Sequence, residues 1–143
     1  MDWIAGARMH FLEILILRAT TVIPMFVLGF SPVAVNSYIF VVYLYSTFVH
    51  ANLNWRFSFF EKLLVTPRFH HWHHGIEKEA IDVNFAIHFP WLDWLFGTYH
   101  FPKNQWPNGY GIEGHPVPLG YVKQFNYPFK RQKKAAATSE TVT

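Results

Sequence analysis

The chain of 143 residues has no cysteine and few charged residues. Without cysteine it can form no disulfide framework, thiolate zinc site or iron–sulfur cluster, and it has no thiol nucleophile. Only 15% of the residues are charged, whereas 51% are hydrophobic and 20% are aromatic. A domain this small cannot bury so many aromatic side chains, because small domains bury a lower fraction of their surface. We therefore expect part of the apolar surface to face lipid or another protein.

Basic residues are missing from a long stretch near the start of the chain. The net charge is +3, yet no lysine or arginine lies between Arg18 and Arg56. Apolar residues fill this gap, which is typical of a membrane protein and not of a nucleic-acid-binding surface. We therefore expect no nucleic-acid partner. The basic cluster that begins at Lys130 opens a polar segment, and residues 130–143 are predicted to be a disordered tail that rests on anionic lipid headgroups.

Two apolar stretches predict a transmembrane helical hairpin. Residues 14–30 and 33–49 contain 17 residues each, so as helices they are ~26 Å long and need a few flanking residues to span a bilayer. Gly29, Ser31 and Pro32 predict a tight turn between them. The hairpin then covers about residues 12–50 with both ends on one side, and the flanking cations place that side in the cytoplasm. The alternative is a pair of buried helices in a soluble bundle.

The remainder of the chain, residues 51–129, mixes aromatic, charged and turn-forming residues. This composition predicts short helices and loops at the cytoplasmic face of the membrane. The predicted fold class is therefore an all-α membrane protein. Residues 1–129 are expected to form one domain, in which the membrane hairpin supports a histidine-rich metal site.

A cluster of histidines lies between Thr66 and Gly75. Thr66 is a favourable N-cap, Pro67 suits the first helical position, and Gly75 suits a left-handed C-cap, so the segment predicts a short helix. His70, His73 and His74 are spaced i, i+3 and i+4, which places their imidazoles on one face, where they can converge on one or two metal ions. His71 points away from this face and is expected either to lie at the surface or to hydrogen-bond a metal ligand.

Two further histidines stand at the ends of the predicted hairpin. The hairpin brings His10 and His50 to the face that carries the short helix, so five imidazoles are expected to meet there. The alternative for each of the two is a capping or interfacial role. His88, His100 and His115 are expected to be structural. Candidate hydrogen-bond partners that fix the imidazole tautomers are Glu13, Asp82, Asn84 and Asp93, whose alternative role is to solvate helix ends and loops.

The donor set limits the chemistry of such a site. Neutral nitrogen ligands suit zinc or non-haem iron, and ligand type alone does not separate the two metals. The His-Glu-x-x-His motif of hydrolytic zinc sites and the Glu-x-x-His motif of soluble di-iron bundles are both missing. A histidine cluster beside lipid fits iron and O₂ better. The expected substrate is an acyl chain or sterol that reaches the metal through an apolar channel.

Several segments between residues 2 and 100 resemble the fatty acid hydroxylase and sterol desaturase superfamily of integral-membrane di-iron oxygenases. The opening Asp2-Trp3-Ile4-Ala5-Gly6-x-Arg8-x-His10-Phe11-x-Glu13 is similar to the segment after the family's first His-x-x-His-His box. Phe48-Val49-His50-Ala51-Asn52 resembles its His-Ala/Ser-Asn element. Thr66-Pro67-x-x-His70-x-x-His73-His74 resembles its final His-x-x-His-His box, and Asp82-x-Asn84-Phe85 with Trp91-Leu92-Asp93-x-Leu95-Phe96-Gly97-Thr98-Tyr99 resembles its closing segments.

The resemblance implies a ligand set and a reaction. His10, His50, His70, His73 and His74 would be iron ligands, and the reaction would be O₂-dependent hydroxylation or desaturation of a fatty acyl chain or sterol. Electrons would come from a cytochrome b5-type or ferredoxin partner. The family's upstream His-x(3,4)-His box and first His-x-x-His-His box are missing, so we expect a truncated form. The alternative is a non-catalytic membrane metal-binding remnant, in which zinc can replace iron.

Overall fold

The structure is a computed structural model that describes residues 1–7, 9–55, 59–111 and 118–130. The chain divides into two compact units, residues 1–110 and residues 111–143. Among the described residues there are helices and no β-strand, apart from an isolated bridge between Gly75 and Tyr110. The prediction of a helical fold is therefore confirmed. The predicted tail lies outside the described residues except for Lys130.

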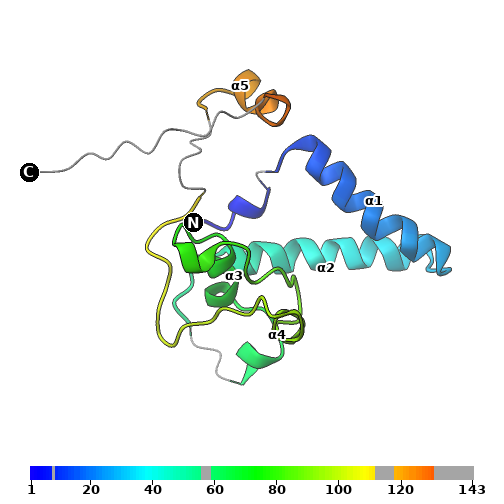
Figure 1. Ribbon diagram of the computed structural model, residues 1–143. Coiled ribbons are helices and arrows are strands. Elements are labelled where there is room, and N and C mark those ends of the chain that lie inside the picture. Colours follow the sequence, from blue (N-terminus) through cyan, green and yellow to red (C-terminus); the bar gives the residue numbers. More distant parts are fainter. Residues whose placement is uncertain (8, 56–58, 112–117, 131–143) are drawn as a thin grey trace, which may run out of the picture. The chain divides into compact units, whose positions relative to one another are not determined.

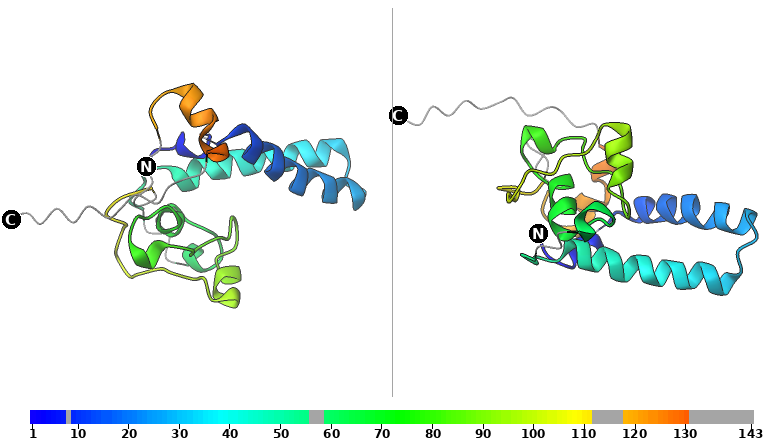
Figure 2. Two further views of the ribbon diagram at one scale, coloured as in Figure 1. Left: turned by 45° about the horizontal axis from the view of Figure 1, so that its top comes forward. Right: turned by 90° about the horizontal axis from the view of Figure 1, so that it is seen from below.

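Two helices form the predicted hairpin. Helix α1 (Phe11–Val27) and helix α2 (Pro32–His50) run antiparallel and diverge from the turn that joins them (Figures 1 and 2). In this turn Gly29 has a positive φ of 83°, which glycine adopts without steric cost. The hydroxyl of Ser31 accepts from the Ala34 N–H at 3.2 Å, and Pro32 is the first residue of α2. The predicted turn is thus confirmed, although α1 begins and ends three residues earlier than expected.

The hairpin exposes apolar side chains along its length. All residues of α1 are described and none of them is buried, whereas Val35, Val49 and His50 are the buried residues of α2. In α1 the hydroxyls of Thr20 and Thr21 donate to backbone carbonyls of the preceding turn. Among the described residues α2 is the one helix long and apolar enough to cross a membrane.

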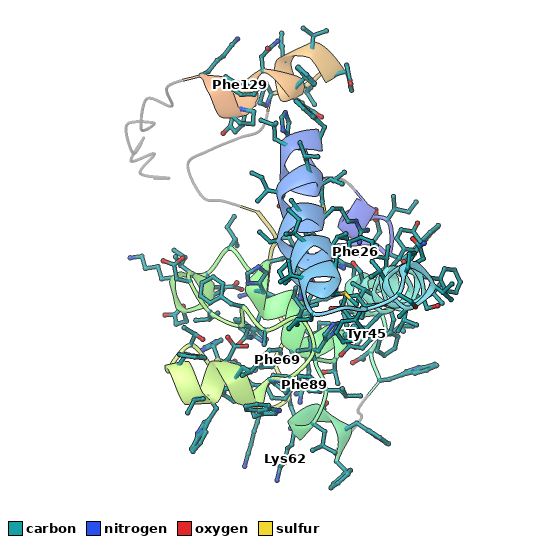
Figure 3. All side chains as sticks on the ribbon, turned by 90° about the vertical axis from the view of Figure 1, so that its right-hand side faces the viewer. Phe26, Tyr45, Lys62, Phe69, Phe89 and Phe129 are labelled. Atoms are coloured by element: carbon teal, nitrogen blue, oxygen red, sulfur yellow. The ribbon has the colours of Figure 1, made fainter. Side chains whose placement is uncertain are left out.

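The first unit also contains a group of short elements. These are the 3₁₀ helices η1 (Ala5–Ala7), η2 (Phe60–Lys62) and η3 (Lys78–Ala80), with helices α3 (Pro67–His73) and α4 (Trp91–Phe96). Of these elements, α3 and η1 pack against α2. Val49 of α2 forms a small apolar core with Val65 and Phe69, which fixes α3 on α2. The Tyr45 hydroxyl strengthens this junction by donating to the Val65 carbonyl, and its ring packs against the same core. Figure 3, a view along α2, labels both Tyr45 and Phe69.

The second unit is small. Its described part contains helix α5 (Tyr121–Phe125) and the 3₁₀ helix η4 (Tyr127–Phe129). The Asn126 side chain donates to the Val122 carbonyl at 2.9 Å and closes the last turn of α5. All candidate ligands lie in the first unit.

Candidate metal centre

Helix α3 carries the histidine cluster, and its ends differ in detail from the prediction. Pro67 is its first residue, as expected, but the Thr66 hydroxyl makes no capping hydrogen bond, and His74 is the C-cap. Gly75 does not adopt the left-handed conformation that the sequence suggested. Glycine is needed at position 75 for another reason, because a Cβ there would lie 2.7 Å from the Ala80 Cβ. Close packing on the loop after α3 therefore requires glycine at this position.

Three imidazoles converge where α3 meets the end of α2. Nε2 of His70 lies 3.1 Å from Nε2 of His50 and 3.1 Å from Nε2 of His74. Of the described residues, these three form the group whose ligand atoms all lie within 4.8 Å of one another. The helical spacing i, i+4 brings His70 and His74 together, and the packing of α3 on α2 adds His50.

The orientation of two rings is set by backbone carbonyls. Nδ1 of His50 lies 2.7 Å from the Ser46 carbonyl oxygen, and Nδ1 of His73 lies 2.9 Å from the Val83 carbonyl oxygen. A carbonyl can only accept, so each Nδ1 carries the proton and each Nε2 keeps its lone pair. Hydrogen bonds of this kind hold metal-ligating imidazoles in one tautomer. Both rings are thus prepared to bind through Nε2.

The surroundings of His70 and His74 favour the neutral form of both imidazoles. Burial lowers the pKa of His70 well below its usual value, and the neighbouring histidines lower it further. Burial, with the adjacent His73 and His50, lowers the pKa of His74 to about 4. Neutral imidazole is the form that binds metals, and lone pairs that face one another require a proton or a cation between them.

The arrangement fits a transition-metal ion. Two nitrogens bound at roughly 2.1 Å to one ion lie about 3.0–3.4 Å apart, and the two Nε2 separations in the cluster fall in this range. The donor set is nitrogen only, which suits iron or zinc. The residues that could hold such an ion are His50, His70 and His74.

Of the other two predicted ligands, His73 lies beside this group but outside it. The ring of His73 stacks on that of His70, with centroids 5.7 Å apart, and it lies 5.1 Å from the ring of His74. His10 is the N-cap of α1, where its Nδ1 accepts from the Leu12 N–H at 3.3 Å. In a neutral ring this bond leaves the proton on Nε2. A ligand role for His10 and His73 stays a prediction.

Two of the four proposed hydrogen-bond partners, Asn84 and Asp93, bond backbone groups of α3 and of the loops around it. Asn84 is buried, and its amide bonds the carbonyls of Phe69 and His100 and the His100 N–H. The buried Asp93 carboxylate accepts from the N–H groups of Phe85 and Ala86 and from the Thr98 hydroxyl. Neither residue reaches an imidazole through these bonds, so they act on the loops that hold α3. Asp82 is exposed, with φ of 56°.

His71 has a buried structural role that the sequence did not reveal. It points away from the cluster, as expected, but it is fully buried, and its Nδ1 lies 2.8 Å from the Tyr110 hydroxyl. Burial lowers the pKa of His71 to about 4, so the ring is a neutral link between α3 and the segment around Trp106 and Tyr110. The partner is 39 residues away in the chain, and no local pattern signals the pair. His115 lies outside the described residues.

A cavity of about 310 Å³ opens beside the cluster. His50, His70, His73 and His74 line it together with Glu13, and apolar side chains line the rest, including Leu17 of α1 and Val42 of α2. The cavity therefore combines nitrogen donors with apolar walls that run along the diverging helices.

Comparisons with known proteins point to one family of enzymes. Residues 1–98 match the model of the family described as fatty acid hydroxylase. The chain is 30% identical over 132 residues to the ornithine lipid hydroxylase OlsE of Rhizobium tropici. That alignment covers 91% of the chain and 39% of the relative, so the chain spans about two fifths of the length of this curated protein. No solved structure matches the chain.

Proposed function

Because the chain belongs to the fatty acid hydroxylase family, we propose that it acts in a membrane-bound, O₂-dependent oxidoreductase that hydroxylates a lipid. The observation that carries this proposal is the convergence of the Nε2 atoms of His50, His70 and His74 beside an apolar cavity. A hydrolytic or purely structural metal site does not need an apolar chamber against its ligands. A lipid oxygenase does, because its substrate is an acyl chain.

The proposed cofactor is iron, held by His50, His70 and His74, with His73 and His10 as further candidate ligands. When bound, it supplies the O₂-dependent oxidation of an unactivated C–H bond, chemistry that side chains alone do not provide. The family resemblance implies two irons in a complete site. The pair of backbone bonds at His50 and His73 orients the donors before any metal binds.

The protein's own contribution is to place the substrate and exclude water. The apolar walls at Leu17 and Val42 accept methylene groups, and apolar burial of each CH₂ contributes about 0.8 kcal/mol. Glu13 adds a carboxylate to the same cavity. Held in this way, a lipid chain presents one carbon to the nitrogen cluster. Such orientation lowers the reaction barrier, because the substrate loses its translational and rotational entropy on binding and not in the reaction step.

The substrate class and partners follow from the same proposal. The relative's name specifies an ornithine lipid, and we propose a membrane lipid for this chain also. The hairpin of α1 and α2 would anchor the protein, with the metal centre on the cytoplasmic face. Electrons would come from a cytochrome b5-type or ferredoxin donor.

A non-catalytic metal-binding protein is the second candidate. The observation that favours it is the size of the cluster, because the described residues bring together three nitrogen atoms, enough for one ion and too few for two. Such a protein would hold zinc or a single iron at His50, His70 and His74 and would hydroxylate nothing.

Metal analysis combined with a product assay separates these functions. The full chain, purified in detergent from iron-supplemented cells, is analysed for bound metal as wild type, as His70→Ala and as the control His88→Ala. We expect iron in the wild type and in the control and its loss in His70→Ala. Expression in cells that supply lipid and reductant, followed by mass spectrometry of the lipids, should show products with one added oxygen atom. Metal without product favours the second candidate, and a metal-free wild type excludes both.

A further inference from the structure

Residues 85–96, which include α4, present an unusually apolar surface. Trp94 and Phe96 are 74% and 76% exposed, and Phe85, Ile87, Phe89, Trp91 and Leu95 are also exposed. No lysine or arginine lies between Lys78 and Lys103. Exposed apolar patches of this kind mark an interaction surface.

This segment lies beside the apolar part of α2 and not beyond its end. Nε2 of His88 is 3.4 Å from the Tyr38 hydroxyl, and the His88 ring is 5.4 Å from that of Tyr45. Tyr38 precedes His50 by 12 residues, which is about 18 Å along a helix axis. Figures 1 and 2 show α4 on the side of α3 that faces the hairpin turn. The segment is therefore level with the stretch of α2 that has the composition of a membrane span.

Several backbone groups in the irregular half of the segment, before α4, find partners inside the protein. Asp93, 2% exposed, accepts from the N–H groups of Phe85 and Ala86. The His88 carbonyl accepts from the Val65 N–H, and the Thr98 N–H returns to the Asp93 carbonyl. Irregular backbone enters lipid only where its polar groups find partners inside the protein. The buried Asp93 carboxylate satisfies two of these groups, while the apolar side chains of the segment are exposed.

We propose that residues 85–96 are immersed in the membrane boundary next to α2, with lipid as their partner. This inference rests on the membrane location of α2 given under the proposed function. Lipid suits the surface better than a protein partner because the neighbouring helix α2 also exposes apolar side chains, among them Phe40, Val41 and Leu44. Trp91 and Trp94 belong to the residue type enriched where acyl chains meet headgroups.

The lack of cysteine makes a direct test possible. Single cysteines are introduced as Trp94→Cys in α4, Phe40→Cys in α2 and Glu79→Cys in η3, all at exposed positions. Each variant carries a nitroxide label in vesicles of phosphatidylcholine and phosphatidylglycerol. Collision with O₂, which concentrates in lipid, is compared with collision with a water-soluble nickel chelate. We expect the labels at positions 94 and 40 to collide with O₂ more than with nickel and the label at 79 to show the reverse.

The three positions distinguish the possible failures. A nickel-accessible label at position 94 beside a lipid-exposed label at position 40 overturns the inference and leaves the membrane location of α2 intact. A label at 94 that neither reagent reaches is covered by protein, which also overturns the inference. A nickel-accessible label at 40 contradicts the membrane location itself. Phe96→Cys, tested in parallel, reports on the same surface if the first substitution prevents folding.

Discussion

At the scale of single residues, the direction of each imidazole lone pair depends on the backbone beside it. His50 donates to the carbonyl of Ser46, one turn earlier in its own helix. His73 donates to Val83, in the loop that follows η3. One ring is thus positioned by local helix geometry, and the other depends on a loop that must be held in place. Asn84, next to Val83, ties this loop to the Phe69 carbonyl of α3.

Asp93 offers a test of this loop support. Its replacement in Asp93→Ala leaves the partly buried N–H groups of Phe85 and Ala86 and the Thr98 hydroxyl without the Asp93 carboxylate as acceptor. Unsatisfied buried donors are costly, so we expect a loss of roughly 2–4 kcal/mol in the free energy of unfolding. Denaturant unfolding in detergent, followed by tryptophan fluorescence, measures it. The control Asp82→Asn, at an exposed position whose positive φ asparagine also tolerates, should change stability by less than about 0.5 kcal/mol. Equal effects would contradict the assigned role of Asp93.

At the scale of elements, the sequence predicts what depends on neighbouring residues. Hydropathy locates α1 and α2, Gly29 and Ser31 mark their turn, and Pro67 marks the start of α3. Helical spacing also anticipates that His70 and His74 lie together. These signals act over one or two helical turns, so they survive in any tertiary context that keeps the helix.

The remaining features depend on contacts between distant segments. The Asn84 amide bonds the Phe69 carbonyl, 15 residues away, and His71 meets Tyr110 across 39 residues. Neither partner is visible in a local pattern. Gly75 was predicted as a left-handed cap but is required by its closeness to Ala80. Backbone conformation and close packing both select glycine, and the sequence does not distinguish them.

The contact between η1 and α2 permits a test at this scale. A Cβ on Gly6 would lie 2.6 Å from the Ser46 Oγ and 3.0 Å from the His50 ring. We expect Gly6→Ala to displace His50 and to weaken metal binding about tenfold, equivalent to about 1.4 kcal/mol. Adding Ser46→Ala removes the closest atom and should restore part of the affinity. Metal titration of the two single variants and the double variant gives the coupling energy. Purely additive losses would show that the clash does not transmit to His50.

At the scale of the whole first unit, the nitrogen cluster joins two elements that are also linked by a small apolar core and by the hydrogen bond from Tyr45 to Val65. His50 belongs to α2, and His70 and His74 belong to the segment of α3. A bound ion therefore crosslinks the hairpin to the surface elements. Ligands that bind only the folded state add to its stability according to their concentration and affinity.

Metal removal tests this crosslink. At a free metal concentration one hundred times Kd, one site adds about 2.7 kcal/mol to the stability. We expect a chelator to lower the Tm of the wild type and to leave that of His70→Ala almost unchanged, because that variant lacks the central donor. Differential scanning fluorimetry in detergent measures both. A chelator effect of equal size in the two proteins would place the stabilising metal elsewhere.

The two walls of the cavity differ in the side chains that line them. The nitrogen atoms of the cluster come from the wall formed by α2 and α3, whereas α1 contributes Glu13 and Leu17. A substitution at Leu17 can change the size of the chamber without moving an imidazole. Under the proposed function, a change in the lipid that is accepted would therefore need a mutation in α1 and none in the imidazole ligands. The first apolar helix is accordingly the place to look for inherited differences in substrate range.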